Sequence, residues 1–205
     1  MDASATGTKR MKGVRRKTPD APSGPADGDD VLALMELLFF AYRDFIAEPD
    51  TMLAELGFGR AHHRVLHFIG RHPGLRVSEL LAILRITKQS LGRVLRELVG
   101  RGYVLQEEGA TDRRQRLLRL TPAGRHLLER LEAPQIARVR AALASAGEGA
   151  RTAFVHALLG LVDEAEREHV AALCGLPTTM VPARQEASTE DPADNAENAE
   201  SGPHG

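Results

Sequence analysis

Residues 73–104, PGLRVSELLAILRITKQSLGRVLRELVGRGYV, contain the pattern that decides the fold. The spacing of their apolar residues predicts one short helix over 77–84 and a second over 87–99, with a short turn between them. Thr87 is a typical N-cap for the second helix, because its hydroxyl can accept a hydrogen bond from a free backbone N–H. Two helices joined by so short a turn form a helix-turn-helix, in which the second helix enters the major groove of DNA.

The flanking residues extend this pair to a winged helix-turn-helix. A helix is expected over 60–71, and the glycines within 100–102 are expected to end the second helix of the pair. Residues 103–108 and about 115–120 then read as two strands joined by a turn, which predicts a β-hairpin wing. The fold class expected from this order is mainly α with a small β-hairpin wing, and the DNA-binding domain is expected over residues 60–120.

Further helices are expected on both sides of that domain. One runs over 31–47, and Thr121-Pro122 begins a long helical region that we expect to bend or break at Pro134. Glycines within 147–149 interrupt it, and a last helix follows over about 151–173. The first and last helices carry more apolar surface than a monomer of this size could bury, so residues 30–59 and 121–175 are expected to form a helical dimerisation region.

Charge is segregated along the chain, although the formal net charge is only −1. Residues 60–120 hold 13 basic and 5 acidic side chains, as a DNA-binding domain requires. Residues 1–29 are expected to be a disordered basic arm, and residues 176–205 a disordered acidic tail, because both lack large apolar residues. The basic arm is expected to add non-specific affinity for DNA.

Composition also favours a cytoplasmic protein. The single cysteine, Cys174, excludes a disulfide within one chain. No apolar run approaches the ~18–20 residues of a membrane span, and no signal-peptide core follows the N-terminal charges, so no membrane partner is expected.

The exposed face of the second helix has the chemistry of groove recognition. Its apolar residues fall on one side, which leaves polar and basic residues on the other. Arginine can bind guanine with two hydrogen bonds, and glutamine can do the same with adenine. The residues expected to contact DNA are Thr87, Lys88, Gln89, Ser90, Arg93 and Arg96 of the helix, with Asp112, Arg113, Arg114 and Arg116 of the wing. The alternative is that these charges form a solvated surface.

These motifs resemble the multiple-antibiotic-resistance regulator (MarR) family. Residues 73–104 are similar to the paired helices of that family, and TDRRQRLLRLTPAGRHLL, residues 111–128, is similar to its wing and the start of its linker helix. The resemblance implies that Arg113 or Arg114 probes the minor groove while Asp112 braces the wing. Two departures from the family pattern are Gly92, where relatives often carry a small polar residue, and residues 108–110 of the wing.

The resemblance also implies partners. It implies an obligate homodimer on a pseudo-palindromic double-stranded operator, and repression relieved by a small aromatic or other ligand. Phe39, Tyr42, His63 and His67 are the candidate pocket residues. For the aromatic residues, the alternative interpretation is a dimer core.

Two other kinds of site receive less support. His63 and His67 stand four residues apart on a helix, a spacing that can hold a metal ion. No HExxH or CxxC pattern adds ligands, so neither a metal nor a cofactor is predicted. Cys174 has few positive charges near it in sequence, which argues against a redox switch.

The predicted function is therefore that of a sequence-specific, homodimeric transcriptional regulator, a repressor relieved by a ligand. The alternative is a constitutive DNA-binding dimer without an effector. An enzyme is not expected, because no G-x-S-x-G, P-loop or dinucleotide motif occurs.

Overall fold

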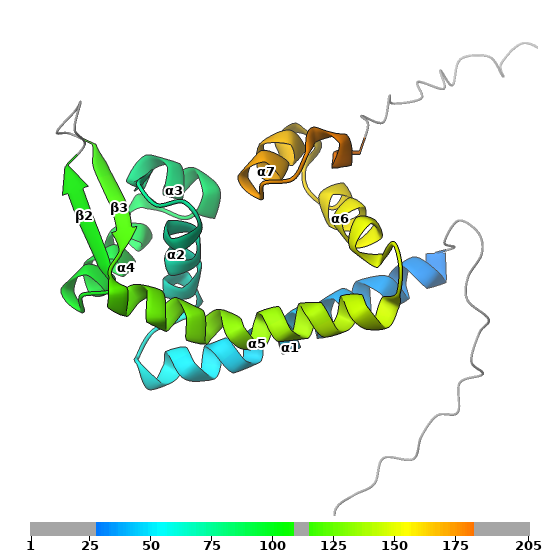
Figure 1. Cartoon of the computed structure of the whole chain (residues 1–205), viewed down its shortest axis with the longest axis horizontal. Coiled ribbons are helices and arrows are strands. Elements are labelled where there is room, and N and C mark those ends of the chain that lie inside the picture. Colours follow the sequence, from blue (N-terminus) through cyan, green and yellow to red (C-terminus); the bar gives the residue numbers. More distant parts are fainter. Residues whose placement is uncertain (1–27, 109–114, 183–205) are drawn as a thin grey trace, which may run out of the picture. The chain divides into compact units, whose positions relative to one another are not determined.

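The computed structural model describes residues 28–108 and 115–182. It packs as two units that divide within one long helix, the first ending at Gln135 and the second beginning at Ile136 (Figure 1). Most of the two terminal arms predicted to be disordered lies outside the described residues. The prediction is wrong at their inner ends, because residues 28–29 begin the first helix and residues 178–180 form a 3₁₀ turn. The predicted wing tip, with Asp112, Arg113 and Arg114, also lies outside the described residues. No described helix combines the length and apolarity needed to cross a membrane.

The first unit is a winged helix. Its elements are α1 (Gly28–Glu55), α2 (Arg60–Arg71), β1 (Leu75–Arg76), α3 (Val77–Leu84), α4 (Lys88–Gly100), β2 (Val104–Glu108), β3 (Arg116–Leu120) and the first part of α5 (Pro122–Ala146). The expected hairpin of β2 and β3 is present, and β1 adds a third strand that the sequence did not predict. All pairs are antiparallel in the order β1-β3-β2, so Leu118 lies opposite both Leu75 and Gln106.

Helix α4 is defined at both ends by local hydrogen bonds. The Thr87 hydroxyl accepts from the backbone N–H of Ser90 at 3.1 Å, as an N-cap does. At the other end Gly102 has a φ of 73°, and the N–H of Tyr103 donates to the carbonyl of Leu98 at 2.9 Å. This is a Schellman ending, which needs a residue that tolerates a left-handed backbone. The expected cap and stop of this helix are both confirmed.

The core of the unit gathers around α2 and α4. Helix α4 buries Leu91, Val94, Leu95 and Leu98, and α2 buries Val65, Leu66 and Ile69. Leu80 and Leu84 of α3, Leu53 of α1, Leu118 of β3 and Leu131 of α5 complete it. The apolar side chains of every element therefore converge on the helix pair, and the polar side of α4 faces out.

Helix α1 is longer than the sequence predicted, since it continues to Glu55 through Pro49. A proline inside a helix leaves the carbonyl four residues earlier without its usual donor. Here that carbonyl belongs to Phe45, and it accepts from the Gln135 side-chain amide at 3.2 Å. The donor comes from 90 positions along the chain, so the local sequence could not indicate it.

Helix α5 also continues through a proline, because its span includes Pro134. The predicted bend or break is therefore not a break at this residue. Proline fixes φ at a value close to that of a helix. Pro134 therefore removes one backbone hydrogen bond from α5 without forcing the chain to leave the helical conformation.

The predicted single helix over 151–173 is also wrong. The second unit instead contains α6 (Ala150–Gly160), the 3₁₀ turns η1 (Glu164–Glu166) and η2 (Thr178–Met180), and α7 (Arg167–Leu173). The guanidinium of Arg167 donates to the carbonyls of Gly160 and Val162 at 3.2 and 3.1 Å. These bonds satisfy carbonyls at the end of α6 and so stabilise a turn where the sequence pattern indicated more helix.

The junction between the wing and α5 requires a glycine at 124. A Cβ atom on Gly124 would overlap the carbonyl oxygen of Tyr103. The same carbonyl accepts from the N–H of Thr121 at 3.1 Å, and the Thr121 hydroxyl accepts from the N–H of Gly124 at 2.9 Å. The atom that a Cβ on Gly124 would meet is a backbone carbonyl oxygen, so it cannot move aside as a flexible side chain would.

We expect Gly124→Ala to lower the free energy of unfolding by about 1–3 kcal/mol or more, because it overfills a tight backbone contact. Gly100→Ala is the matched control, since the space around the Cβ position of Gly100 is open. Urea denaturation of the three proteins measures the difference. Equal stability of Gly124→Ala and the parent would contradict this account of the junction.

Candidate DNA-binding surface

The outward face of α4 is polar and basic because its other face is buried. Leu91, Val94, Leu95 and Leu98 are at most 4% exposed. The side chains predicted to reach DNA from this helix are all exposed: Lys88, Gln89, Ser90, Arg93 and Arg96. The structure therefore brings these five together on one face of a single helix.

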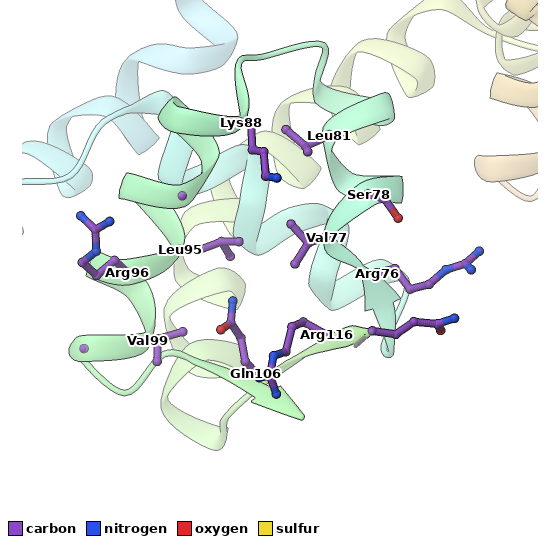
Figure 2. Close-up of a pocket in the computed structure, with 13 residues that line it drawn as sticks. Arg76, Val77, Ser78, Leu81, Lys88, Leu95, Arg96, Val99, Gln106 and Arg116 are labelled. Carbon is purple, nitrogen blue, oxygen red and sulfur yellow. The ribbon is translucent and has the colours of Figure 1, made fainter. Parts of the chain in front are cut away.

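A groove of about 1010 Å³ separates α4 from α3 and the sheet. Figure 2 shows Lys88 and Leu95 of α4, Leu81 and Val77 of α3, and Gln106 of β2 around this hollow. The remaining lining residues are Arg76, Ser78, Gly92, Arg96, Val99, Gly100, Gln115 and Arg116. A second hollow of about 270 Å³ is lined by Gln89, Ser90, Arg93 and Arg96. Arg96 thus borders both.

The large groove is electropositive. Among the described residues that line it, four are cationic and none is acidic: the cations are Arg76, Lys88, Arg96 and Arg116. Two of the four have a carboxylate partner. Arg76 pairs with Glu79 at 2.5 Å and Arg116 pairs with Glu108 at 3.0 Å.

The ion pair of Arg76 also affects the pKa of its partner, Glu79. Hydrogen bonds from the side chain and the backbone N–H of Arg76 lower the pKa of Glu79. That carboxylate therefore stays ionised at neutral pH and offsets part of the charge of Arg76.

The cations on α4 differ from these. Within residues 28–108 and 115–182, Lys88, Arg93 and Arg96 form no ion pair with a carboxylate. A cation that is already paired must exchange its partner before it can bind a phosphate, whereas these three need not. The uncompensated positive charge of this surface is thus concentrated on the predicted recognition helix.

Thr87 has a different position from the other predicted contact residues. Its hydroxyl accepts from the N–H of Ser90 and donates to the Ser90 hydroxyl at 2.9 Å. Both hydrogen-bonding functions of Thr87 therefore serve the start of α4. The geometry favours a role in which Thr87 orients Ser90.

A hydrogen bond between His62 and Glu97, which the sequence did not suggest, links α4 to α2. Nδ1 of His62 accepts from the backbone N–H of Gly59 at 3.1 Å, so the ring proton is on Nε2, 2.9 Å from the Glu97 carboxylate. The His62 ring stacks on Phe58 with centroids 4.4 Å apart. This contact holds the non-DNA side of α4 against α2, so the helix has a defined orientation.

The sequence also missed part of the groove. Arg76, Ser78, Gln106 and Gln115 line it but were not predicted. The alternation of β2 could have indicated Gln106, since Val104, two residues earlier, is buried on the same face of the strand. Arg76 belongs to β1, whose two residues are too few for a recognisable pattern.

The candidate pocket residues lie on two helices. Phe39 and Tyr42 are exposed on α1, at 66% and 55%. On α2, Nδ1 of His67 lies 2.6 Å from the Glu132 carboxylate of α5. Burial, followed by the charge of His67, lowers the pKa of the neighbouring His63, while Glu132 and Asp50 raise it. His63 is consequently neutral at pH 7.

The two less supported kinds of site, a metal site and a reactive cysteine, can also be compared with the structure. The described residues contain no group of three or more histidine, cysteine or acidic side chains that could hold a metal ion. Cys174 is an exposed free thiol at the end of α7.

Gly92 is the one residue on the outward face of α4 whose presence the helix itself disfavours. It lies in the helix interior, where glycine costs about 0.8–1.0 kcal/mol relative to alanine. It is exposed, and a Cβ there would meet nothing within 4 Å. Neither packing nor backbone conformation in the chain therefore requires a glycine at this position.

Comparison with known proteins agrees with this geometry. A sequence model of the MarR family matches residues 56–115. The HTH-type transcriptional regulator PetP of Rhodobacter capsulatus is 43% identical over 161 residues, which cover 75% of this chain and 97% of that protein.

Solved structures show the same fold. A crystal structure of a MarR family transcription regulator has a TM-score of 0.55 at 19% identity, covering 72% of this chain and 94% of the other. Streptococcus pneumoniae FabT in complex with DNA has a TM-score of 0.57 at 19% identity, covering 64% and 94%.

The relatives are transcriptional regulators, a class of proteins that are not enzymes. The family model covers the helix-turn-helix and the first strand of the wing, and the 43% identical regulator is matched along almost its whole length. The chain therefore belongs to the MarR family of DNA-binding, winged-helix transcriptional regulators.

Proposed function

We propose that this regulator is a sequence-specific homodimer that binds a pseudo-palindromic operator and represses transcription until a small ligand releases it. The observation that supports the DNA-reading part is a cluster of cations on α4 beside an electropositive groove. Within residues 28–108 and 115–182 these cations form no ion pair with a carboxylate. Phosphates supply most of the attraction of DNA for such a surface, and base edges supply its specificity.

The residues divide between these two roles by their position on α4. Gln89, Ser90 and Arg93 lie in the first two turns, where a side chain can reach base edges in the major groove. Lys88 and Arg96 border the large groove and suit phosphates. We assign Arg116, with Asp112, Arg113 and Arg114, to the wing's contact with the minor groove and its flanking phosphates.

The domain division follows from this assignment. Residues 60–120 form the reading domain, and residues 30–59 and 121–175 supply the dimer contacts. We propose that the basic arm at 1–29 adds salt-sensitive affinity and that the acidic tail at 176–205 does not contact DNA.

Arg93→Ala tests the assignment of base reading. On an operator selected by the parent protein from a random DNA pool, we expect a loss of about 1–3 kcal/mol per half-site, up to double in the dimer. Affinity for a scrambled duplex should change much less. Fluorescence anisotropy at one fixed salt concentration measures both.

Arg151→Ala is the matched control for this measurement, because Arg151 is exposed on α6 and belongs to the other unit. Melting and sedimentation must be unchanged for both variants. Parent-like binding of the selected operator by Arg93→Ala would show that the reading surface has been wrongly assigned.

The homodimer proposal rests on the apolar surface of α1. Seven large apolar side chains between residues 31 and 40 are about half exposed or more: Leu32, Leu34, Met35, Leu37, Leu38, Phe39 and Phe40. A monomer rarely exposes so continuous an apolar surface, and a second copy of the chain can cover it symmetrically. Helix α6 adds Phe154 and Leu158, which are also exposed within one chain.

We expect the parent protein to sediment as a dimer at micromolar concentration. The double variant Leu34→Asp/Leu38→Asp places two charges on one face of α1 and should dissociate it, because charges buried in an interface cost several kcal/mol. Ala82→Asp adds a charge to an exposed position on α3, outside the proposed dimer contacts, and should leave the dimer intact. A parent protein that is a folded monomer at this concentration would contradict the proposal.

The ligand part of the proposal rests on the junction of α2 with α5. The bond between His67 and Glu132 ties the reading domain to α5, and the half-buried neutral His63 lies beside it. A ligand that prefers one arrangement of this junction would shift the orientation of α2 and, through His62 and Glu97, that of α4. Phe39 and Tyr42 are the aromatic surfaces proposed for the ligand.

We expect at least one member of a panel of phenolic acids to weaken operator binding several-fold in fluorescence anisotropy. His63→Gln, which keeps a polar side chain of similar size, should retain operator affinity and reduce the response. If the whole panel left the affinity unchanged, the protein would instead be a constitutive DNA-binding dimer.

A further inference from the structure

Gly92 occupies the middle of a cationic stripe on α4. Lys88 precedes it by one helical turn and Arg96 follows it by one turn, so the three lie on one face. The two cations are separated by eight residues, or about 12 Å along the helix axis. All three residues line the large groove. The stripe therefore consists of two long basic side chains with a gap between them, where the helix backbone is bare.

The groove into which this gap opens has apolar side chains in its lining. Leu81 and Leu95 line the same groove, and in Figure 2 both approach the hollow that Lys88 also enters. Leu95, which follows Gly92 by three residues, is buried against the core. A phosphate would be poorly solvated against these side chains, whereas a small apolar group would fit them.

Nothing within the chain requires the residue at position 92 to lack a side chain. The space around the Cβ position of Gly92 is open, and glycine destabilises a helix interior. An alanine would thus fit the chain by itself and make the helix more stable. A residue that lowers stability without a packing reason is typical of a binding site, where a partner requires the space.

We propose that Gly92 determines specificity by letting the backbone of α4 approach a base pair closely, with the C5 methyl group of a thymine in the gap. This rests on the proposed function, in which α4 enters the major groove. The thymine methyl is the one apolar group that the standard base pairs present there. The gap lacks a methyl-sized side chain, so a methyl group from DNA is the occupant of matching size and polarity.

The test uses Gly92→Ala and an operator in which each thymine in turn is replaced by uracil, which lacks the C5 methyl. On the thymine operator we expect Gly92→Ala to bind at least ten-fold more weakly than the parent, with less than a two-fold change on scrambled DNA. At one symmetric pair of positions, uracil should weaken the parent protein several-fold and restore most of the binding of Gly92→Ala. The alanine methyl would there replace the methyl of the base.

Two further variants separate size from other effects. Gly92→Leu should lose more operator affinity than Gly92→Ala, and uracil should not restore it. Gly160→Ala makes the same change in the last turn of α6, also in open space but in the other unit, and should stay within two-fold of the parent. The melting temperature of Gly92→Ala should rise by about 2–4 °C, which shows that the loss of binding is not a loss of fold.

The results that would overturn this inference differ from those that would overturn the proposed function. If the parent protein showed no preference for any selected duplex over scrambled DNA, the proposed function would be wrong. If the parent protein showed that preference and Gly92→Ala matched its operator affinity, the role of Gly92 would be overturned. Weakened binding that uracil restored at no position would overturn the thymine methyl as the occupant.

Discussion

The burial of one face of α4 is the constraint on which the rest of the structure depends. Leu91, Val94, Leu95 and Leu98 are nearly inaccessible to solvent, and each buried leucine or valine contributes about 1.5–3 kcal/mol relative to an exposed one. Rotating α4 by half a turn would expose these four and bury its arginines, at a cost that a domain of this size could not sustain. The orientation of the polar face is therefore decided by packing on the opposite side.

Hydrogen bonds then restrict the position of α4 along and around its axis. Thr87 and Gly102 define its ends, and the pair between His62 and Glu97 connects its flank to α2. At the wing, Tyr103 touches both the end of α4 and the start of α5 through backbone groups. A displacement of α5 would thus reach the end of α4 through backbone contacts.

The sequence predicted those parts of the fold that local chemistry determines. Helices α2, α3 and α4 follow from apolar spacing and from caps a few residues away, and the exposed face of α4 follows from the same spacing. The errors share a different cause. Pro49 is tolerated because Gln135 donates to the carbonyl of Phe45, and α6 ends early because Arg167 folds back on it. Strand β1 exists only because β3 is there to pair with it, so the groove residues that it positions were not predictable.

The distribution of ion pairs explains how a chain with a net charge of −1 can carry a DNA-binding surface. Glu79, Glu107 and Glu108 pair with Arg76, Arg119 and Arg116, so the acids of the winged helix neutralise arginines of β1 and β3. Exposed pairs of this kind contribute little to stability, about 0–1 kcal/mol each. Their larger effect is on where positive charge remains. Among the described residues that line the groove, Lys88 and Arg96 of α4 are the cations without a carboxylate partner. Attraction to DNA then depends on this local field, whose range in physiological salt is about 8 Å, far more than on the sum over the chain.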